Sequence, residues 1–291
     1  MMPGPKAIRQ AQLMTATRVE TGTDELLCSI SDQIATLTLN RPEKRNALSD
    51  RLTPALRASL LELEANGDVR VIVITGSGKA FCSGGDVSGM GSKMSGDASD
   101  AKAPTLEDSI RTLQQRQETL TLRLHELAKP TIAALPGAAA GAGMSIALAC
   151  DMRIASQSAF LAPGFANIGL SGDYGGSWFL ANLVGPGKAK ELYFTGRWVY
   201  AEEAQALGIF NVVVADDELA ERTREIAQSI ADGPPIAIRY MKENLNRAML
   251  ADLKTCLAME ADRTVRCSRS DDHKEAVAAF LGKRKPQFSG R

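Results

Sequence analysis

The stretch "TIAALPGAAAGAGMSIALACDMRIAS", residues 131–156, contains the pattern that decides the fold of this chain. Its apolar beginning, residues 131–137, is typical of a buried strand and ends in a cluster of small residues. The apolar run over 142–151 predicts a short helix, and "MRIASQSAFLAP" (152–163) predicts two further short strands. Strands and a helix in this order indicate an α/β protein.

The same alternation extends towards the N-terminus. The segment "IATLTLN" (34–40) alternates apolar and polar residues as a half-buried strand does, and "VRVIVITGSG" (69–78) is typical of a buried strand that ends in glycine. Between them, residues 49–66 predict a helix for which Ser49 or Asp50 is the candidate N-cap.

Towards the C-terminus the pattern changes once. Helices are predicted over 176–185, where Gly185 and Pro186 stop the pattern, and over 188–196, and "IFNVVVAD" (209–216) closes the α/β series. From about residue 217 the segments all have helical period, which predicts an all-helical C-terminal module. Amphipathic helices at a chain end need the core, a neighbouring subunit or both to bury their apolar faces.

We therefore expect a loose N-terminal extension over 1–23, a core over 24–216 and a helical module over 217–291. The extension is basic before Glu20 and faintly resembles an organellar transit peptide, although a simple loose tail is the stronger interpretation. Residues 89–108, rich in Gly, Ser, Asp and Ala, are expected to form either a mobile cover over a site or a featureless insertion.

The composition excludes several classes of protein. The 34 basic residues balance the 34 acidic ones among 291, so charge gives no support for a nucleic-acid partner or a membrane surface. No stretch approaches the roughly 20 apolar residues of a spanning helix. The chain has five scattered cysteines and two histidines, which argues against a disulfide framework and a metal site. Unpaired cysteines fit a reducing compartment, the cytoplasm.

Three loops are rich in small or basic residues: 40–49, 79–90 and 136–151. None has the spacing of a dinucleotide or P-loop phosphate site. The second and third place flexible backbone directly before helices, where backbone N–H groups are unpaired. Two such helix starts that face each other form an oxyanion hole, whereas each cluster taken alone favours a turn or close helix packing.

The segments "KAFCSGGD", "PGAAAGAGMSIALACDMRIAS", "NIGLSGDYGGSWFL" and "AVAAFLGKRKPQF" together resemble the crotonase, or enoyl-CoA hydratase/isomerase, superfamily over residues 24–288. The resemblance implies a spiral of repeated ββα turns and a helical C-terminal module that builds trimers or dimers of trimers. It also implies an acyl-coenzyme A thioester as ligand. Coenzyme A (CoA) is then part of the substrate, and no separate cofactor is expected.

The resemblance assigns roles by position. The oxyanion-hole N–H groups are those of Gly85 and Ala142, and only the backbone of Ala142, where many relatives have Gly, is needed. Lys44 and Arg45 are placed to meet the CoA phosphates. The backbone near Ala47 and Leu48 is placed to meet adenine. The positions that the resemblance assigns to substrate or CoA binding are Lys44, Arg45, Ala47, Leu48, Ser83, Phe165, Phe280 and Lys283.

The family's hydratases use two glutamates, which by position fall on Ser145 and Phe165 here, so the usual hydratase machinery is absent. Asp173, in "LSGDYGG", instead matches an acidic residue of the isomerase branches, above all the 1,2-epoxyphenylacetyl-CoA and Δ3,Δ2-enoyl-CoA isomerases. One carboxylate in an apolar pocket suffices to move a proton between carbons. The competing interpretation is that Asp173 only caps the following helix.

These observations favour an acyl-CoA isomerase that shifts a double bond or opens a small ring through an enolate, with Asp173 as acid and base. The alternative is an enoyl-CoA hydratase or related lyase. A hydrolase or dehalogenase with Asp173 as nucleophile is weaker, because the matching histidine is absent. A non-catalytic acyl-CoA binder or an RNA-binding relative is a further alternative, and the neutral charge argues against RNA.

Overall fold

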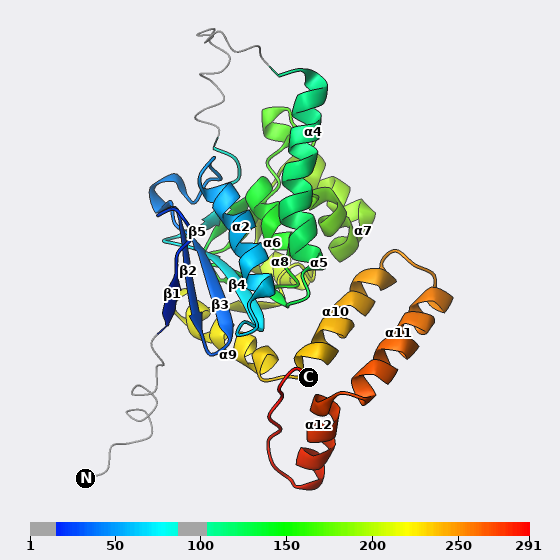
Figure 1. Cartoon of the computed structure of the whole chain (residues 1–291). Helices are drawn as coiled ribbons and strands as arrows, with labels where there is room; N and C mark the ends of the chain where they lie inside the picture. Colours follow the sequence, from blue (N-terminus) through cyan, green and yellow to red (C-terminus); the bar gives the residue numbers. More distant parts are fainter. Residues whose placement is uncertain (1–15, 87–103) are drawn as a thin grey trace, which may run out of the picture.

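The computed structural model describes residues 16–86 and 104–291 and contains two sheets (Figure 1). The larger sheet has the strand order β1-β2-β3-β4-β6-β8-β11, with parallel pairing from β3 to β11 and antiparallel pairing of β1, β2 and β3. Its strands are β1 (Thr17–Val19), β2 (Leu26–Ser31), β3 (Ile34–Leu39), β4 (Val71–Gly76), β6 (Thr131–Leu135), β8 (Met152–Ser156) and β11 (Val212–Val214).

The smaller sheet has the order β10-β9-β7-β5, in which β5, β7 and β9 are parallel. Its strands are β5 (Ala80–Cys82), β7 (Ala138–Ala140), β9 (Phe160–Ala162) and β10 (Val199–Tyr200). Strands β4, β6 and β8 of the larger sheet are each followed directly by β5, β7 and β9 of the smaller one. This stepwise advance confirms the expected spiral of repeated turns.

The helices surround and extend these sheets (Figure 1). They are η1 (Pro42–Lys44), α2 (Leu52–Ala65), α4 (Leu106–Gln117), η3 (Glu118–Leu122), α5 (Arg123–Glu126), α6 (Ala142–Ala149), η4 (Ala166–Ile168), α7 (Gly176–Thr195), α8 (Ala201–Ala206), η5 (Asp216–Glu218), α9 (Leu219–Ala231), α10 (Pro235–Ala248), α11 (Leu253–Ser268) and α12 (Asp271–Leu281). None of the described helices combines the length and the apolar character needed to cross a membrane.

The core follows from the spacing of apolar residues. Helix α2 buries Leu52, Leu56, Leu60 and Leu63, which recur at helical spacing on one face. All eight residues of α6 are buried, which agrees with its sequence, apolar except for Ser145. Helix α9 packs against β3, β4, β6 and β8, so the first helix after residue 217 covers the larger sheet. Figure 1 shows α10, α11 and α12 extending away from that sheet.

Several boundaries differ from the predictions. The loose extension expected over 1–23 is wrong in its last part, because β1 (Thr17–Val19) pairs with β2; residues 1–15 lie outside the described residues. The segment expected to lack structure, 89–108, ends in the first turn of α4, where Thr105 and Asp108 form a capping box. Residues 89–103 of the segment expected as a cover lie outside the described part of the chain.

Two predicted helix boundaries have different outcomes. The N-cap of α2 is Arg51, which makes no side-chain capping bond, so the prediction of Ser49 or Asp50 as N-cap is wrong, although the Ser49 hydroxyl oxygen accepts the N–H of Leu52 at 2.9 Å just before the helix. Helix α7 is broken at Gly185, whose φ of 77° and ψ of 158° are far from helical values. Glycine is suited to this conformation because it has no Cβ atom. All five cysteines are free.

Replacing Gly143 by Ala is expected to destabilise the fold. A Cβ atom at Gly143 would lie 2.3 Å from the carbonyl oxygen of Cys82, so α6 would have to move away from β5. We expect a loss of about 2–3 kcal/mol in the free energy of unfolding, measured by urea denaturation. Gly187→Ala, in a helix but with nothing within 4 Å of its Cβ position, is the matched control. An equal loss in both variants would contradict this account.

Candidate active site

Two glycine-rich turns meet at one edge of the smaller sheet. Strands β5 and β7 are parallel neighbours, so the chain leaves both of them at the same edge. Gly84 has a φ of 90° and Gly141 a φ of 49°. A Cβ atom at Gly84 would lie 2.9 Å from the Ala140 carbonyl oxygen and 3.4 Å from the Ala142 nitrogen. The two turns are therefore in direct contact through backbone atoms.

The N–H of Gly85 is left out of the local hydrogen-bond ladder. Leu48 donates its N–H to the Gly84 carbonyl oxygen at 2.8 Å, and Asp86 donates its N–H to the Leu48 carbonyl oxygen at 3.2 Å. This parallel bridge uses backbone groups of Gly84 and Asp86, the residues on either side of Gly85, so the N–H of Gly85 takes no part in it. Gly85 itself is exposed.

The N–H of Ala142 lies at the start of α6. The N–H of Ser145 donates to the Gly141 carbonyl oxygen at 3.1 Å, so the N–H groups before it belong to the unpaired first turn of the helix. The N-cap Gly141 has no side chain to satisfy them. The backbone of Gly85 and Ala142 thus supplies two N–H donors in adjoining turns, an arrangement that suits a developing oxyanion.

The 40–49 loop is attached to this edge. The Ser83 N–H donates to the Arg45 carbonyl oxygen at 3.0 Å, and the Ser83 hydroxyl donates to the Lys44 carbonyl oxygen at 3.2 Å. Lys44 and Arg45 are exposed, whereas Ala47 and Leu48 are buried. The structure therefore brings these five predicted residues together next to the two glycine-rich turns.

Asn46 is a structural residue of this loop that the sequence analysis missed. Its side chain is fully buried, donates to the carbonyl oxygens of Ser77 and Ala80 at 3.0 and 2.8 Å, and accepts the N–H of Arg41 at 2.9 Å. Asn46 has a φ of 56°, which asparagine tolerates better than most residues. Arg41 forms an ion pair with Asp86 at 3.1 Å, so it supports the loop from within.

Asp173 does not cap the following helix. Helix α7 begins at Gly176, and its N-cap is Gly175, with no side-chain cap. One carboxyl oxygen of Asp173, Oδ1, is buried and has no hydrogen-bond partner among the described residues. Burial raises the pKa of this carboxyl from 3.8 to about 6. A carboxyl in this state is able both to accept and to release a proton near neutral pH.

The two positions that hold glutamates in hydratases are closed here. Ser145 is fully buried, and its Oγ lies 3.0 Å from the Asp173 carbonyl oxygen and 3.3 Å from that of Gly141. Phe165 is 4% exposed, and its ring stacks on Tyr193 with centroids 5.8 Å apart. The Phe165 ring also lies 3.8 Å from the position of a Cβ at Gly141, which gives the turn an apolar wall.

Tyr193 is a second residue that the sequence analysis missed. Its hydroxyl is buried without a partner among the described residues. Burial and the nearby charge of Asp173 both raise the pKa of this phenol. Its sequence context, the helical run 188–196, gave no sign of this position, because only the folded chain brings residue 193 beneath Asp173.

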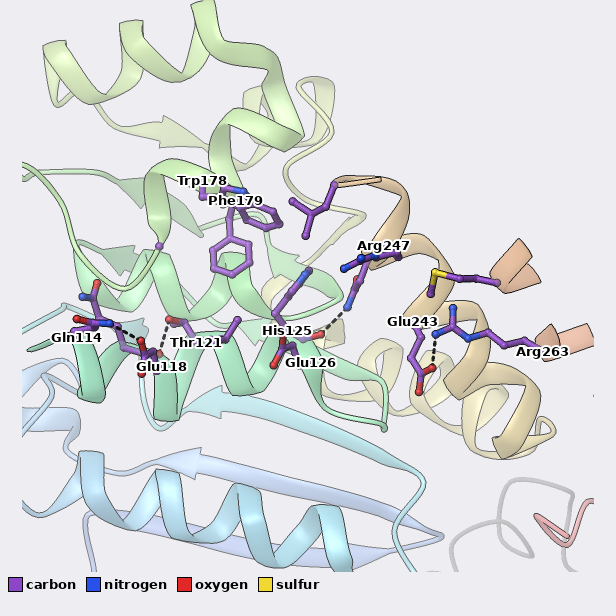
Figure 2. A pocket seen from close by; sticks show the side chains of 16 residues that line it. Gln114, Glu118, Thr121, His125, Glu126, Trp178, Phe179, Glu243, Arg247 and Arg263 are labelled. Carbon is purple, nitrogen blue, oxygen red and sulfur yellow. Dashed lines mark hydrogen bonds and ion pairs between the residues drawn. The ribbon is translucent and has the colours of Figure 1, made fainter. Parts of the chain in front are cut away.

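The turn after Asp173 borders a pocket of about 830 Å³ between the long helix over 106–126, α7, α10 and α11. The Tyr174 N–H donates to Gln117 Oε1 at 2.6 Å, and Gln117 lines the pocket. Figure 2 shows Trp178 and Phe179 beside His125 in this pocket. Trp178 is 36% exposed there.

Phe280 and Lys283 are not brought to the site within one chain. Phe280 is on α12 and is 83% exposed, and Lys283 follows that helix and is also exposed. Helix α12 packs against α11 and lies far from the edge where β5 ends (Figure 1).

A spiral of ββα turns with a helical C-terminal region is the architecture of the crotonase-type enzymes of acyl-CoA metabolism, and three comparisons agree. The family model for enoyl-CoA hydratase/isomerase matches residues 29–291. The 1,2-epoxyphenylacetyl-CoA isomerase of Escherichia coli (strain K12) is 35% identical over 266 residues, covering 91% of this chain and 98% of that protein. This chain therefore belongs to the enoyl-CoA hydratase/isomerase family.

Other relatives have hydratase names. The short-chain-enoyl-CoA hydratase of Clostridium acetobutylicum is also 35% identical, over 259 residues, covering 87% of this chain and 93% of that protein. A solved structure described as a putative enoyl-CoA hydratase from Streptomyces coelicolor A3(2) has a TM-score of 0.85 and 34% identity, covering 96% of this chain and 99% of that one. The relatives of this chain thus include proteins named as isomerases and proteins named as hydratases.

Asp173→Asn is expected to stabilise the protein more at high pH than at low pH. The folded state holds the Asp173 proton up to about pH 6 and the unfolded state only to about 3.8, so the native carboxylate costs stability as pH rises through this window. Partial exposure to solvent reduces the full linkage value, and we expect the variant to gain about 1–2 kcal/mol at pH 8. Thermal unfolding at pH 4 and pH 8 measures this, and an equal gain at both values would contradict it.

Proposed function

We propose that this protein is an acyl-CoA isomerase that shifts a double bond or opens a small ring through a thioester enolate. The N–H groups of Gly85 and Ala142 hold the enolate oxygen, and Asp173 acts as the single acid and base. The observation that carries the proposal is the Asp173 carboxyl, which has a pKa of about 6, no capping role, and one buried oxygen without a hydrogen-bond partner in residues 16–86 and 104–291.

The chemistry follows from this one carboxyl. The Asp173 carboxylate takes a proton from the carbon next to the thioester carbonyl, and the electron pair moves onto the carbonyl oxygen between the two N–H donors. The resulting carboxylic acid returns the same proton to a carbon two positions away, which completes the double-bond shift. The apolar wall of Phe165 supports this cycle because it limits exchange of the held proton with water.

The loop over 40–49 supports binding of the CoA part. We assign Lys44 and Arg45, both exposed cations beside the hole, to the phosphates, and the backbone at Ala47 and Leu48 to adenine. Ser83 holds this loop to the edge of the sheet through two hydrogen bonds. No cofactor besides the CoA of the substrate enters this proposal, and the site of action proposed is the cytoplasm.

Assembly is part of the same proposal. Helix α12, which contains Phe280 and is followed by Lys283, lies far from the edge where β5 ends in its own chain, so the assigned contact of these residues with CoA requires a second copy (Figure 1). The helices α10–α12 have many exposed apolar side chains, among them Leu245, Leu253 and Leu281. We propose a trimer or a dimer of trimers in which these faces are covered.

The second candidate is an enoyl-CoA hydratase, favoured by the name of the Clostridium acetobutylicum relative. Hydration adds a water across the double bond and requires groups that activate the water and protonate the α-carbon. Ser145 is fully buried, and Phe165 has no ionisable group, so neither position supplies a second acid or base. Hydration here would therefore depend on Asp173 and a group from outside these positions.

Isomerisation and hydration differ in mass, which gives a direct test. We expect trans-3-enoyl-CoA or a ring-type thioester, incubated with the protein in heavy water, to give a shifted double bond with partial deuterium incorporation and no added water. Asp173→Asn should lower this rate by at least 100-fold because the proton acceptor is lost. Product analysis by mass spectrometry and NMR measures both.

The matched control is Asp68→Asn, an exposed aspartate in the turn after α2, which should keep the wild-type rate. A mass gain of one water that persists in Asp173→Asn would overturn the isomerase proposal and support the hydratase. Thioester binding without exchange of any substrate proton would support the non-catalytic alternative.

The pH dependence provides a second test. Because Asp173 must be ionised to accept a proton, kcat/KM for isomerisation should rise with pH and level off above an apparent pKa of about 6. Initial rates between pH 4.5 and 8.5 measure this profile. A profile that falls through pH 6 would mean that the protonated carboxyl is the required form, and it would contradict Asp173 as the initial base.

A further inference from the structure

We propose that Ser145 is a positioning residue, which ties the loop that carries Asp173 to the helix that supplies one donor of the oxyanion hole. The inference rests on the proposed function of Asp173. The fully buried Ser145 hydroxyl lies within hydrogen-bond distance of two carbonyl oxygens, one at Asp173 and one at Gly141.

Ser145 connects the two halves of the site through its hydroxyl and its N–H. The hydroxyl has one proton, which it donates to the Asp173 carbonyl oxygen at 3.0 Å, the shorter of its two contacts; the carbonyl oxygen of Gly141, the residue before Ala142, lies 3.3 Å from Oγ. The Ser145 N–H donates to the same Gly141 carbonyl oxygen at 3.1 Å. One residue therefore contacts the turn that presents the hole and the backbone of the proposed base.

The loop that contains Asp173 packs tightly against Ser145 and Tyr193. A Cβ atom at Gly176 would lie 2.4 Å from Ser145 Oγ and 2.6 Å from Tyr193 Oη. A Cβ atom at Gly172 would lie 3.1 Å from the Tyr193 ring. The backbone on both sides of Asp173 is thus held between a serine of α6 and a tyrosine of α7, with glycines where they meet.

Ser145 acts through Asp173 and not on the substrate. Its side chain is 0% exposed, so it cannot touch a bound thioester. Proton transfer depends steeply on the distance between base and carbon, and a displacement of about 1 Å can cost about 100-fold in rate. Loss of the Ser145 hydroxyl should therefore slow proton transfer while thioester binding is kept.

The test compares two buried serines. We expect Ser145→Ala to lower the rate of α-proton exchange of an enoyl-CoA in heavy water by 10- to 100-fold, with KM within threefold of the wild-type value. Ser156→Ala on β8 removes an equally buried hydroxyl whose oxygen lies 3.1 Å from that of Ser158, and it should exchange at the wild-type rate. Mass spectrometry of the recovered thioester measures exchange, and thermal unfolding compares the stability of both variants.

A further variant separates the hydrogen bond from packing. Ser145→Cys fills the same space with a weak hydrogen-bond donor, so exchange should fall as it does in Ser145→Ala. A wild-type rate in either Ser145 variant, or an equal loss in Ser156→Ala, would overturn the positioning role.

The outcomes also distinguish this inference from the proposed function. The wild-type protein could exchange the α-proton with solvent without shifting the double bond, and this exchange could be lost in Asp173→Asn. That result would overturn the isomerase proposal, and the Ser145 comparison would still test the positioning role. Absence of exchange in the wild type would overturn both.

Discussion

The close backbone packing of α6 against β5 is the contact on which the rest of the site depends. Gly143 allows it, because any side chain there would meet the Cys82 carbonyl oxygen. This approach puts the first turn of α6, with its unpaired N–H groups, beside the turn that contains Gly85. Small residues thus contribute by letting two stretches of backbone approach each other closely. No functional side chain is needed, because the proposed donors are backbone N–H groups.

The same packing determines the electrostatic character of the site. Helix α6 is buried on all sides, Phe165 covers its beginning, and the loop with Asp173 packs against this helix through Ser145, so the Asp173 carboxyl is partly removed from water. Burial without a donor is unfavourable for a carboxylate, and this cost is what brings its pKa near neutrality. The burial of Asp173 therefore lowers the stability of the fold at neutral pH, and the same burial gives the proposed base a pKa suited to proton transfer.

The sequence predicted most of the fold, because strand and helix formation depends on local patterns. Strand and helix periodicity predicted an α/β core, and the family resemblance added the spiral and the candidate site residues. Clusters of small residues marked the two glycine-rich turns. Asn46 and Tyr193 were missed because their roles arise from contacts with distant segments. The short strand over 17–19 exists only through its pairing with β2, and so its three residues have no recognisable pattern of their own.

The break at Gly185 has a consequence for how the site is assembled along the chain. In a straight helix Tyr193 would be about 25 Å from Gly176, yet its hydroxyl lies 2.6 Å from the Cβ position there, so the second half of α7 folds back on the first. Asp173 and the ring beneath it therefore belong to one short segment that closes on itself. The two proposed oxyanion-hole donors, Gly85 and Ala142, are in contrast separated by more than fifty residues and meet only when the spiral is wound. One half of the candidate site thus has low contact order and the other high, so the loop with Asp173 can form before the two glycine-rich turns meet.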